Sequence, residues 1–454
     1  MSVSSPAEIS WLRARLTGSL ALPGEPGYDL AAPFNVAVQI APAAVVAAAN
    51  ADDVAETVRF ANENGLRVLP QRTGHGAVAT NLDDVLLVHT TRLDELKIDP
   101  VGKRARVGAG VIWRQVLDAA APHGLAPLVG SAPGVGVVGF LTGGGVGPLV
   151  RTYGLASDTV LAFEVVTGDG RLLRVTPDEH ADLFWGLRGG KNTLGVVTAV
   201  EIALLNLTTV HGGAIYFNGT DASGVLHMWR EWSQALPEHA NTSIALLQLP
   251  PLPGVPEPLA GRFTVAVRFT SIAEADECNA LLAPMRAVAT PLIDTIGALP
   301  YAAIGAVHAD PVDPMPVLET SGLLDELTPE AIDTLLRVAG PDAGSPQIIV
   351  ELRLLGGALA REPEHTSAFC HRDAAFTLLV IGVPMIPGVP EHNAAVQAAM
   401  GPYLTGNEFP NFGAAIGEAR MARVYDENTR TWLSALAERH DPKGVLRVGQ
   451  TVRT

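Results

Sequence analysis

The fold is decided by residues 43–77, which read AAVVAAANADDVAETVRFANENGLRVLPQRTGHGA. Asn50 is a favourable helix N-cap, and the two aspartates soon after it lie where a helix dipole stabilises negative charge. Apolar residues then recur at helical spacing as far as Gly65, which is typical of a helix end. Residues 43–49 fit a strand or a helix by pattern alone, whereas residues 66–71 predict a strand. We therefore expect a strand, a helix and a strand, followed by a glycine-rich loop at a strand end, where α/β proteins often bind ligands.

The chain as far as about residue 207 continues as a mixture of strands and helices, which predicts a compact α+β block. The expected elements are a strand at 85–90, two strands joined by a turn at 100–102, a helix that begins near 113, a hairpin at 159–176, a short helix at 180–190 and a strand at 195–205. From about 208 to 400, proline-rich turns alternate with strands and helices. Residues 350–360 and 375–383 are expected to be neighbouring strands of a second sheet.

Composition limits the class of protein. The 454 residues allow two or three domains or one elaborate domain. The 31 Lys and Arg against 47 Asp and Glu give a net charge of −16, which disfavours nucleic-acid binding. Two cysteines far apart in the chain make no disulfide framework and no Cys-based zinc site, and we expect no metal. The N-terminus does not resemble a signal peptide, and the longest apolar run, at 376–390, is too short for a membrane span. We expect a soluble, cytoplasmic protein without nucleic-acid or membrane partners; the oligomeric state is not predicted.

Two glycine-rich loops carry the chemistry of the first block. They are RTGHGA at 72–77 and VGSAPGVGVVGFLTGGGVG at 129–147. Glycines let backbone N–H groups approach and cradle a pyrophosphate. Neither loop is a Walker motif, and GVGVVG at 134–139 fits the dinucleotide pattern but lacks a preceding strand. Either loop alone is weak evidence, but two in one block, with more glycine at 186–195, predict a long phosphate-bearing ligand.

The order of these loops resembles a known family. Together with three further segments they look like the FAD-binding oxidoreductases of the vanillyl-alcohol-oxidase superfamily, which have a PCMH-type FAD-binding domain. Within it the closest resemblance is to berberine-bridge-enzyme-like proteins, and the tail at 424–450 is similar to that group's closing motif, so the likeness covers both ends of the chain. The three further segments are RTYGLASD at 151–158, DLFWGLRGG at 182–190 and LGVVTAVEIAL at 194–204.

The resemblance implies a fold and a domain plan. The expected fold is α+β, with a PCMH-type FAD-binding domain of two α/β subdomains and an α+β substrate domain built on an antiparallel sheet. The FAD-binding domain would span 1–207, with a core at about 37–207, and the substrate-binding domain would span 208–400. Residues 401–454 would return to the FAD-binding domain.

In the family, the histidine of the first loop carries the flavin through the 8-methyl carbon, which implies a covalent bond at His75. Imidazole is a competent nucleophile near neutral pH, and the flanking glycines leave room for the flavin ring. The competing interpretation is a solvated loop histidine. Many relatives add a second bond from a cysteine of the second loop, but Ala132 stands at that position here. The resemblance therefore implies FAD with a single covalent link.

Further FAD contacts follow from the resemblance. They are Gln71, Arg72, Thr73, Gly74, Gly76 and Ala77 in the first loop, Ser131, Gly134, Val135, Gly136, Val138, Gly139 and Phe140 in the second, and Gly195, Val197 and Gln450 elsewhere. Phe140 fits a position near the flavin face or a place in the core. Residues 189–195 depart from the family's glycine and aromatic pattern, and Lys191 would face either a phosphate or solvent.

Catalytic candidates lie in the predicted second sheet. Glu351 and Arg353 are two apart on one strand and so share a face, and charges on an apolar strand are costly to bury unless they are paired or functional. We expect Glu351 to be the catalytic base with Arg353 beside it; the alternative is a structural ion pair near the surface. His371 is a second candidate base, against a plain loop histidine. Further candidates without a ranking are Tyr216, Tyr301 and Tyr425.

The expected activity follows from the resemblance. It implies an oxidase that passes hydride from an alcohol, a hemiacetal or an activated C–H group of a small organic substrate to flavin N5, with O2 as acceptor. The substrate would be a secondary metabolite or sugar derivative by analogy. Three alternatives stay open: a dehydrogenase of the same fold that uses another acceptor, a flavin-dependent oxygenase or cyclase, and a flavin-free binding protein.

Overall fold

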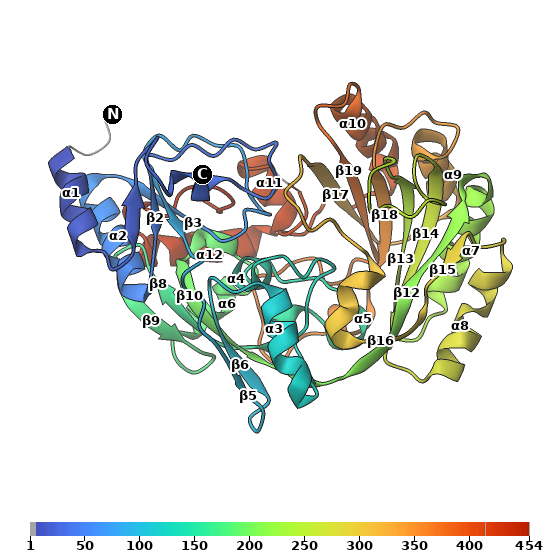
Figure 1. Ribbon diagram of the computed structural model, residues 1–454, viewed down its shortest axis with the longest axis horizontal. Coiled ribbons are helices and arrows are strands. Elements are labelled where there is room, and N and C mark those ends of the chain that lie inside the picture. The colour runs from blue at the N-terminus through green and yellow to red at the C-terminus, as the bar shows by residue number, and fades with distance from the viewer. Residues whose placement is uncertain (1–5, 414, 454) are drawn as a thin grey trace.

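The computed structural model describes residues 6–413 and 415–453. Two lobes lie side by side in Figure 1. One lobe holds two smaller sheets from the first part of the chain, and the other holds one large sheet from its middle. The last helices, drawn in red, return to the first lobe. The α+β fold class is confirmed.

Residues 43–77 supply two of the four strands of the first sheet. Its strand order is β1-β2-β4-β3, with β2, β4 and β3 parallel and β1 antiparallel. The Asn50 side chain accepts a hydrogen bond from the Asp53 N–H at 2.9 Å, and Gly65 ends the helix with a φ of 66°, so both predicted helix signals are confirmed. The elements are α1 (Pro6–Arg15), β1 (Ser19–Ala21), β2 (Ala44–Ala47), α2 (Ala51–Asn64), β3 (Arg67–Gln71) and β4 (Val85–His89).

The second sheet is antiparallel, with the order β5-β6-β10-β8-β9. Trp113 is completely buried in the core under this sheet, together with Phe163 and Phe184. The elements of this part are β5 (Leu96–Asp99), β6 (Arg104–Gly108), α3 (Trp113–Ala120), β7 (Leu125–Ala126), α4 (Val137–Leu141), α5 (Val150–Tyr153), β8 (Val160–Val166), β9 (Leu172–Val175), α6 (Ala181–Leu187), β10 (Val196–Ala203) and β11 (Leu205–Asn206), which pairs with β7.

The large sheet has eight strands in the order β15-β12-β14-β13-β18-β19-β17, with β16 also paired to β12. Its helices pack apolar residues against one face, so the side chains of Glu351 and Arg353 lie on the opposite face. The predicted pairing of β18 with β19 is confirmed. The elements are β12 (Thr209–Asn218), α7 (Ala222–Gln234), β13 (Ala240–Gln248), β14 (Phe263–Ser271), α8 (Ala275–Ala287), β15 (Ile293–Asp294), β16 (Gly297–Pro300), β17 (Leu318–Leu324), α9 (Pro329–Ala339), β18 (Ile349–Leu354), β19 (Phe376–Gly382) and α10 (Val389–Met400).

The C-terminal part fastens onto the first lobe. Helices α11 (Glu418–Val424) and α12 (Glu427–His440) precede a turn in which the Asp441 carboxylate accepts the N–H groups of Val445 and Leu446. The Val445 carbonyl then accepts the N–H of Val68 in β3 at 2.8 Å. This bond brings the end of the chain beside the first glycine loop. None of the described helices combines the length and apolar character needed to cross a membrane.

Candidate cofactor cavity and active site

A cavity of about 330 Å³ lies where the two glycine loops, the C-terminal turn and the large sheet meet. Of the predicted FAD contacts, all except Gly134 line this cavity. They are Gln71, Arg72, Thr73, Gly74, His75, Gly76, Ala77, Ser131, Val135, Gly136, Val138, Gly139, Phe140, Gly195, Val197 and Gln450. Ala132, at the position of the second covalent link in relatives, lines it too.

His75 is held at the cavity wall through one ring nitrogen. Its Nδ1 lies 2.7 Å from the Thr73 hydroxyl oxygen, and its ring stacks on Phe34 with 3.8 Å between centroids. Burial lowers the pKa of His75 to about 4, although Asp310 acts in the opposite direction. The imidazole is therefore neutral at neutral pH. Nε2 has no hydrogen-bond partner among the described residues, so its lone pair is available for a bond to carbon when Nδ1 carries the proton.

Gly74 is required by the geometry of the first loop. Its φ is 70°, in the left-handed region, and a Cβ there would lie 2.5 Å from the Pro33 Cα. The loop therefore bends tightly under His75 and directs it into the cavity.

The second loop offers bare backbone to the cavity. A Cβ added to Gly139 would meet no heavy atom within 4 Å, so this glycine borders open space. Gly130 differs, because a Cβ there would lie 2.8 Å from the Phe140 ring. Phe140 packs edge-on against Trp113 at 5.7 Å and also lines the cavity, so it contributes both to the core and to the cavity wall.

Gln450 provides a test of whether a cofactor fits. Its Nε2 donates to the Gly76 carbonyl at 3.3 Å, while its Oε1 is buried without a partner among the described residues. A buried acceptor without a donor costs about 1–3 kcal/mol. A bound ligand with an N–H or O–H group would satisfy it, as an isoalloxazine can. The orphaned oxygen, the open backbone at Gly139 and the neutral imidazole of His75 all fit FAD.

Lys191, where the chain departs from the family pattern, also lines the cavity. Its φ is 55°, a conformation that glycine adopts more easily, and its Nζ donates to the Asn411 Oδ1. Burial, with a smaller effect of Arg420, lowers the pKa of Lys191 to about 7. The side chain lies at the cavity wall, and whether it meets a phosphate stays a prediction.

Glu351 does not line the cavity. It is 2% exposed, and its Oε1 accepts hydrogen bonds from Ser243 at 2.7 Å and from Arg268 at 2.6 Å. Its Oε2 binds Arg353, which does line the cavity. The two arginines hold the pKa of Glu351 far below its usual range, against the opposing effect of burial. A carboxylate so fully engaged is poorly suited to accept a proton from a substrate. The arrangement is that of an ion pair, but a buried one and not the pair near the surface that the alternative expected.

The other candidates lie away from the cavity. The His371 Nε2 is 3.0 Å from the Arg423 carbonyl oxygen. Tyr301 donates to the Pro127 carbonyl and Tyr425 to the Gly189 carbonyl, both at 2.7 Å, and both rings are buried. None of the three, nor Tyr216, is part of the cavity lining within the described ranges.

The sequence analysis missed an acidic side chain. Glu319, on β17, is the only Asp or Glu of the described chain that lines the cavity. Its Oε1 accepts the Gly413 N–H at 2.9 Å. A signal was present, because Glu319 and Ser321 are two apart on one strand and so share a face, as Glu351 and Arg353 do.

Comparison with known proteins agrees with this geometry. A family model described as an FAD binding domain matches residues 42–176, which run from β2 to β9. The chain is 29% identical to the (R)-6-hydroxynicotine oxidase of Paenarthrobacter nicotinovorans, over 95% of this chain and 96% of that protein. It spans only 34%, 26% and 33% of the length of three further FAD-linked oxidoreductases that it matches.

Solved structures share the whole fold. The crystal structure of 6-hydroxy-D-nicotine oxidase from Arthrobacter nicotinovorans superposes with a TM-score of 0.83 and 26% identity, covering 96% of this chain and 98% of that one. The wild-type BBE-like 1 protein of Physcomitrella patens superposes with a TM-score of 0.83 and 18% identity, covering 98% of each chain, which shows the fold alone. The family model over residues 42–176, these relatives and the lining of the cavity together support an FAD-dependent oxidoreductase with a PCMH-type FAD-binding fold.

Proposed function

We propose that this protein is an oxidase whose flavin is bonded to His75 alone, and that it oxidises a small organic molecule beside that flavin. Residues 1–207 and 401–454 would form the FAD-binding domain, and residues 208–400 the substrate-binding domain. The two lobes of Figure 1 support this division, because the large sheet is confined to the middle of the chain. The observation that carries the proposal is the neutral His75 ring, directed into the cavity with Nε2 free among the described contacts.

A single link through Nε2 follows from the loop geometry. The Thr73 hydroxyl engages Nδ1, which leaves Nε2 as the nucleophile. Ala132 cannot form the second bond. Cys278 and Cys370 are both buried and lie outside the cavity lining, so neither thiol of the chain is placed to replace it.

The glycine loops bind and orient the cofactor through backbone N–H groups. When bound, FAD supplies the oxidant that takes hydride from the substrate. On the opposite wall, Arg353 projects from β18 toward the cavity and lies 5.6 Å from the centre of the Phe412 ring. Its ion pair with Glu351 fixes the guanidinium, so Arg353 is the member of the predicted catalytic set that would contact the substrate, and Glu351 would position it.

The substrate class is an alcohol, a hemiacetal or another activated C–H compound. The chain resembles a nicotine oxidase along nearly its whole length, so we add compounds with a C–H group next to an amine nitrogen to the candidate substrates. We propose O2 as the acceptor, giving hydrogen peroxide. A dehydrogenase that uses a quinone or protein carrier is the competing function.

The experiment is a peroxide assay on the purified yellow protein with a panel of alcohols, sugars and cyclic amines that includes (R)-6-hydroxynicotine. An oxidase releases peroxide under air, and anaerobic flavin reduction by the same compound identifies the substrate. Flavin reduction without peroxide release would favour the dehydrogenase. His75→Ala should leave all flavin extractable by acid, whereas the control His123→Ala, at an exposed residue of the same lobe, should retain it.

A further inference from the structure

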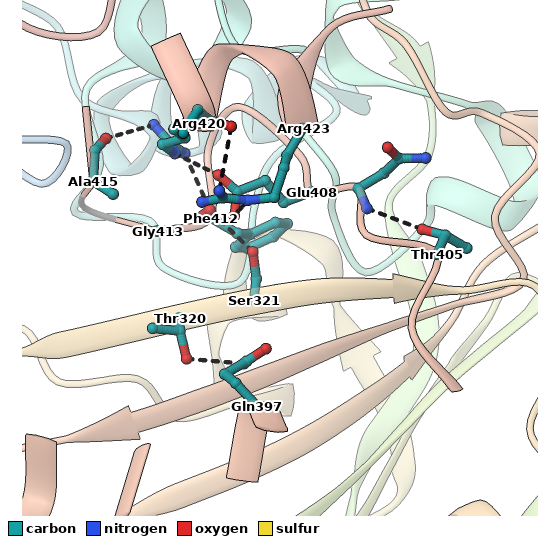
Figure 2. Close-up of polar contacts among 12 residues, drawn as sticks. Thr320, Ser321, Gln397, Thr405, Glu408, Phe412, Gly413, Ala415, Arg420 and Arg423 are labelled. Atoms are coloured by element: carbon teal, nitrogen blue, oxygen red, sulfur yellow. Dashed lines mark hydrogen bonds and ion pairs between the residues drawn. The ribbon is translucent and has the colours of Figure 1, made fainter. Parts of the chain in front are cut away.

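A second cavity, of about 290 Å³, lies at β17, the last strand of the large sheet. Figure 2 shows Arg420, Arg423 and Glu408 together on one side of the strand, with Ser321 directed toward them from the strand, while Thr320 points the other way, toward Gln397. Eight of its thirteen lining residues carry hydroxyl, amide or charged side chains, which offer hydrogen-bond partners to water. Glu319 lines both this second cavity and the FAD cavity.

The carboxyl of Glu319 is held at one oxygen only. Its Oε1 accepts the Gly413 N–H at 2.9 Å. Its Oε2 has no hydrogen bond, and Glu319 forms no ion pair, with any part of the chain that the structure describes. Glu351 is the opposite case, with both oxygens engaged by arginine. Of the two carboxylates, only Glu319 has an oxygen free to receive a proton.

The surroundings of Glu319 raise the pKa of its carboxyl. Burial raises its pKa above the ordinary value of 4.5, while the Gly413 N–H, Arg353 and Arg420 act in the opposite direction and Asp310 adds to the rise. Both arginines of the second cavity pair with Glu408 and not with Glu319. The Arg420 Nε lies 2.6 Å and the Arg423 Nε 3.6 Å from the Glu408 carboxylate. The remaining titratable groups that line the FAD cavity are Arg72, His75 and Lys191.

We propose that Glu319 takes up the proton that a substrate loses on oxidation in the FAD cavity, and releases it to water in the second cavity. This rests on the proposed oxidase function. The substrate O–H or N–H bond breaks, its proton forms an O–H bond at Oε2, and the carbon gives hydride to FAD. Loss of that proton to water restores the carboxylate. Glu319 is therefore a catalytic residue, and β17 separates the site of chemistry from the site of proton release.

A purely structural role makes a different prediction. Glu319 could serve only to fasten the turn at Gly413. In Glu319→Gln the amide oxygen still accepts the Gly413 N–H, but the side chain no longer titrates. The matched control is Glu326→Gln, which removes an exposed carboxylate just beyond the end of the same strand and outside both cavities.

The first test needs no substrate. The oxidised flavin absorbance of the holoenzyme is titrated with pH, because a carboxyl that ionises in the flavin cavity perturbs the spectrum. Lys191 also titrates in this cavity, with a pKa of about 7, so all variants are compared in a Lys191→Met background. There we expect a one-proton transition above the ordinary pKa of glutamate in the parent and in Glu326→Gln, and none in Glu319→Gln. A transition that persists in Glu319→Gln, or that is absent from the parent, would overturn the assignment.

The second test concerns the route of release. After a rapid pH jump, the same transition is followed in the parent and in Asn407→Phe, which places an aromatic ring in the second cavity. We expect an unchanged amplitude and a rate at least several-fold slower. An unchanged rate would rule out the second cavity as the exit.

The third test uses a compound found by the peroxide assay. Anaerobic flavin reduction should slow roughly 10²–10⁴-fold in Glu319→Gln, the usual contribution of a general base. The rise of the parent rate with pH should also disappear. Equal rates in the two proteins would contradict a catalytic role. If no compound reduces the flavin, the oxidase proposal fails, while the two tests on the flavin spectrum still decide whether Glu319 titrates and where its proton goes.

Discussion

Glu351 and Arg353, two residues apart on β18, form an ion pair in which Oε2 lies 2.9 Å from Nε and 2.8 Å from a terminal guanidinium nitrogen. Arg268, from β14, binds the other carboxylate oxygen at 2.6 Å. One buried carboxylate is therefore the shared counter-charge of two arginines, and the pair fixes Arg353 at the cavity wall. Glu351→Gln should lower the free energy of unfolding by about 3–5 kcal/mol, because the arginines lose their counter-charge. Urea unfolding of this variant beside Glu326→Gln measures the loss, and equal stability of the two variants would contradict the account.

The same pair predicts how stability depends on pH. The folded pKa of Glu351 is depressed, so the carboxylate stabilises the folded state above the pKa of the unfolded chain, and this stabilisation is lost as pH falls toward the folded pKa. The difference in melting temperature between the parent and Glu351→Gln should therefore be constant near neutral pH and shrink below about the ordinary 4.5 of glutamate. A difference that grows on acidification would show that Glu351 is not the stabilising charge.

Thr73 is expected to control flavin attachment. Its hydroxyl lies 2.7 Å from the His75 Nδ1, which leaves Nε2 as the ring nitrogen free to bond the flavin. Thr73→Val keeps the shape of the side chain but removes the hydrogen bond. We expect the fraction of flavin that survives acid precipitation to fall several-fold in freshly expressed protein, with little change in folding. Attachment at the parent level would mean that the Thr73 hydroxyl has no part in it.

Two glycines of the second loop should respond in opposite ways to alanine. A Cβ at Gly139 enters open space, and alanine favours helix α4 by roughly 0.5–1 kcal/mol over glycine, so Gly139→Ala should keep or raise stability while it lowers flavin content. A Cβ at Gly147 would collide with the Val129 carbonyl oxygen, so Gly147→Ala should lower stability. Melting temperature and the ratio of flavin to protein absorbance separate the two effects. Full flavin content in Gly139→Ala would place the cofactor away from this loop.

The sequence predicted the parts of the molecule that depend on local pattern or family resemblance. The helix between Asn50 and Gly65 needed only its own caps and apolar spacing. The lining of the cavity by both glycine loops followed from the family likeness. These features lie close together along the chain or belong to recognisable motifs.

The side of the FAD cavity formed by the large sheet could not be predicted in the same way, because its contacts depend on the order of the strands. The sequence places Glu351 beside Arg353 but not opposite Arg268, which reaches it across β13. Likewise, Glu319 lies on β17, which precedes β18 in the chain yet lies beyond β19 in the sheet. Its partner Gly413 comes from a turn 94 residues away. Such relationships appear only once the sheet is assembled.

The central claim is that His75 carries the flavin. The most direct measurement is the mass of the proteolytic peptide that contains His75, taken from acid-denatured protein. Fragmentation of that peptide then locates the modified residue. We predict a peptide heavier by one FAD, with the added mass on His75 and none on the peptide that contains Ala132. An unmodified His75 peptide, with all the FAD free in the acid supernatant, would contradict the account.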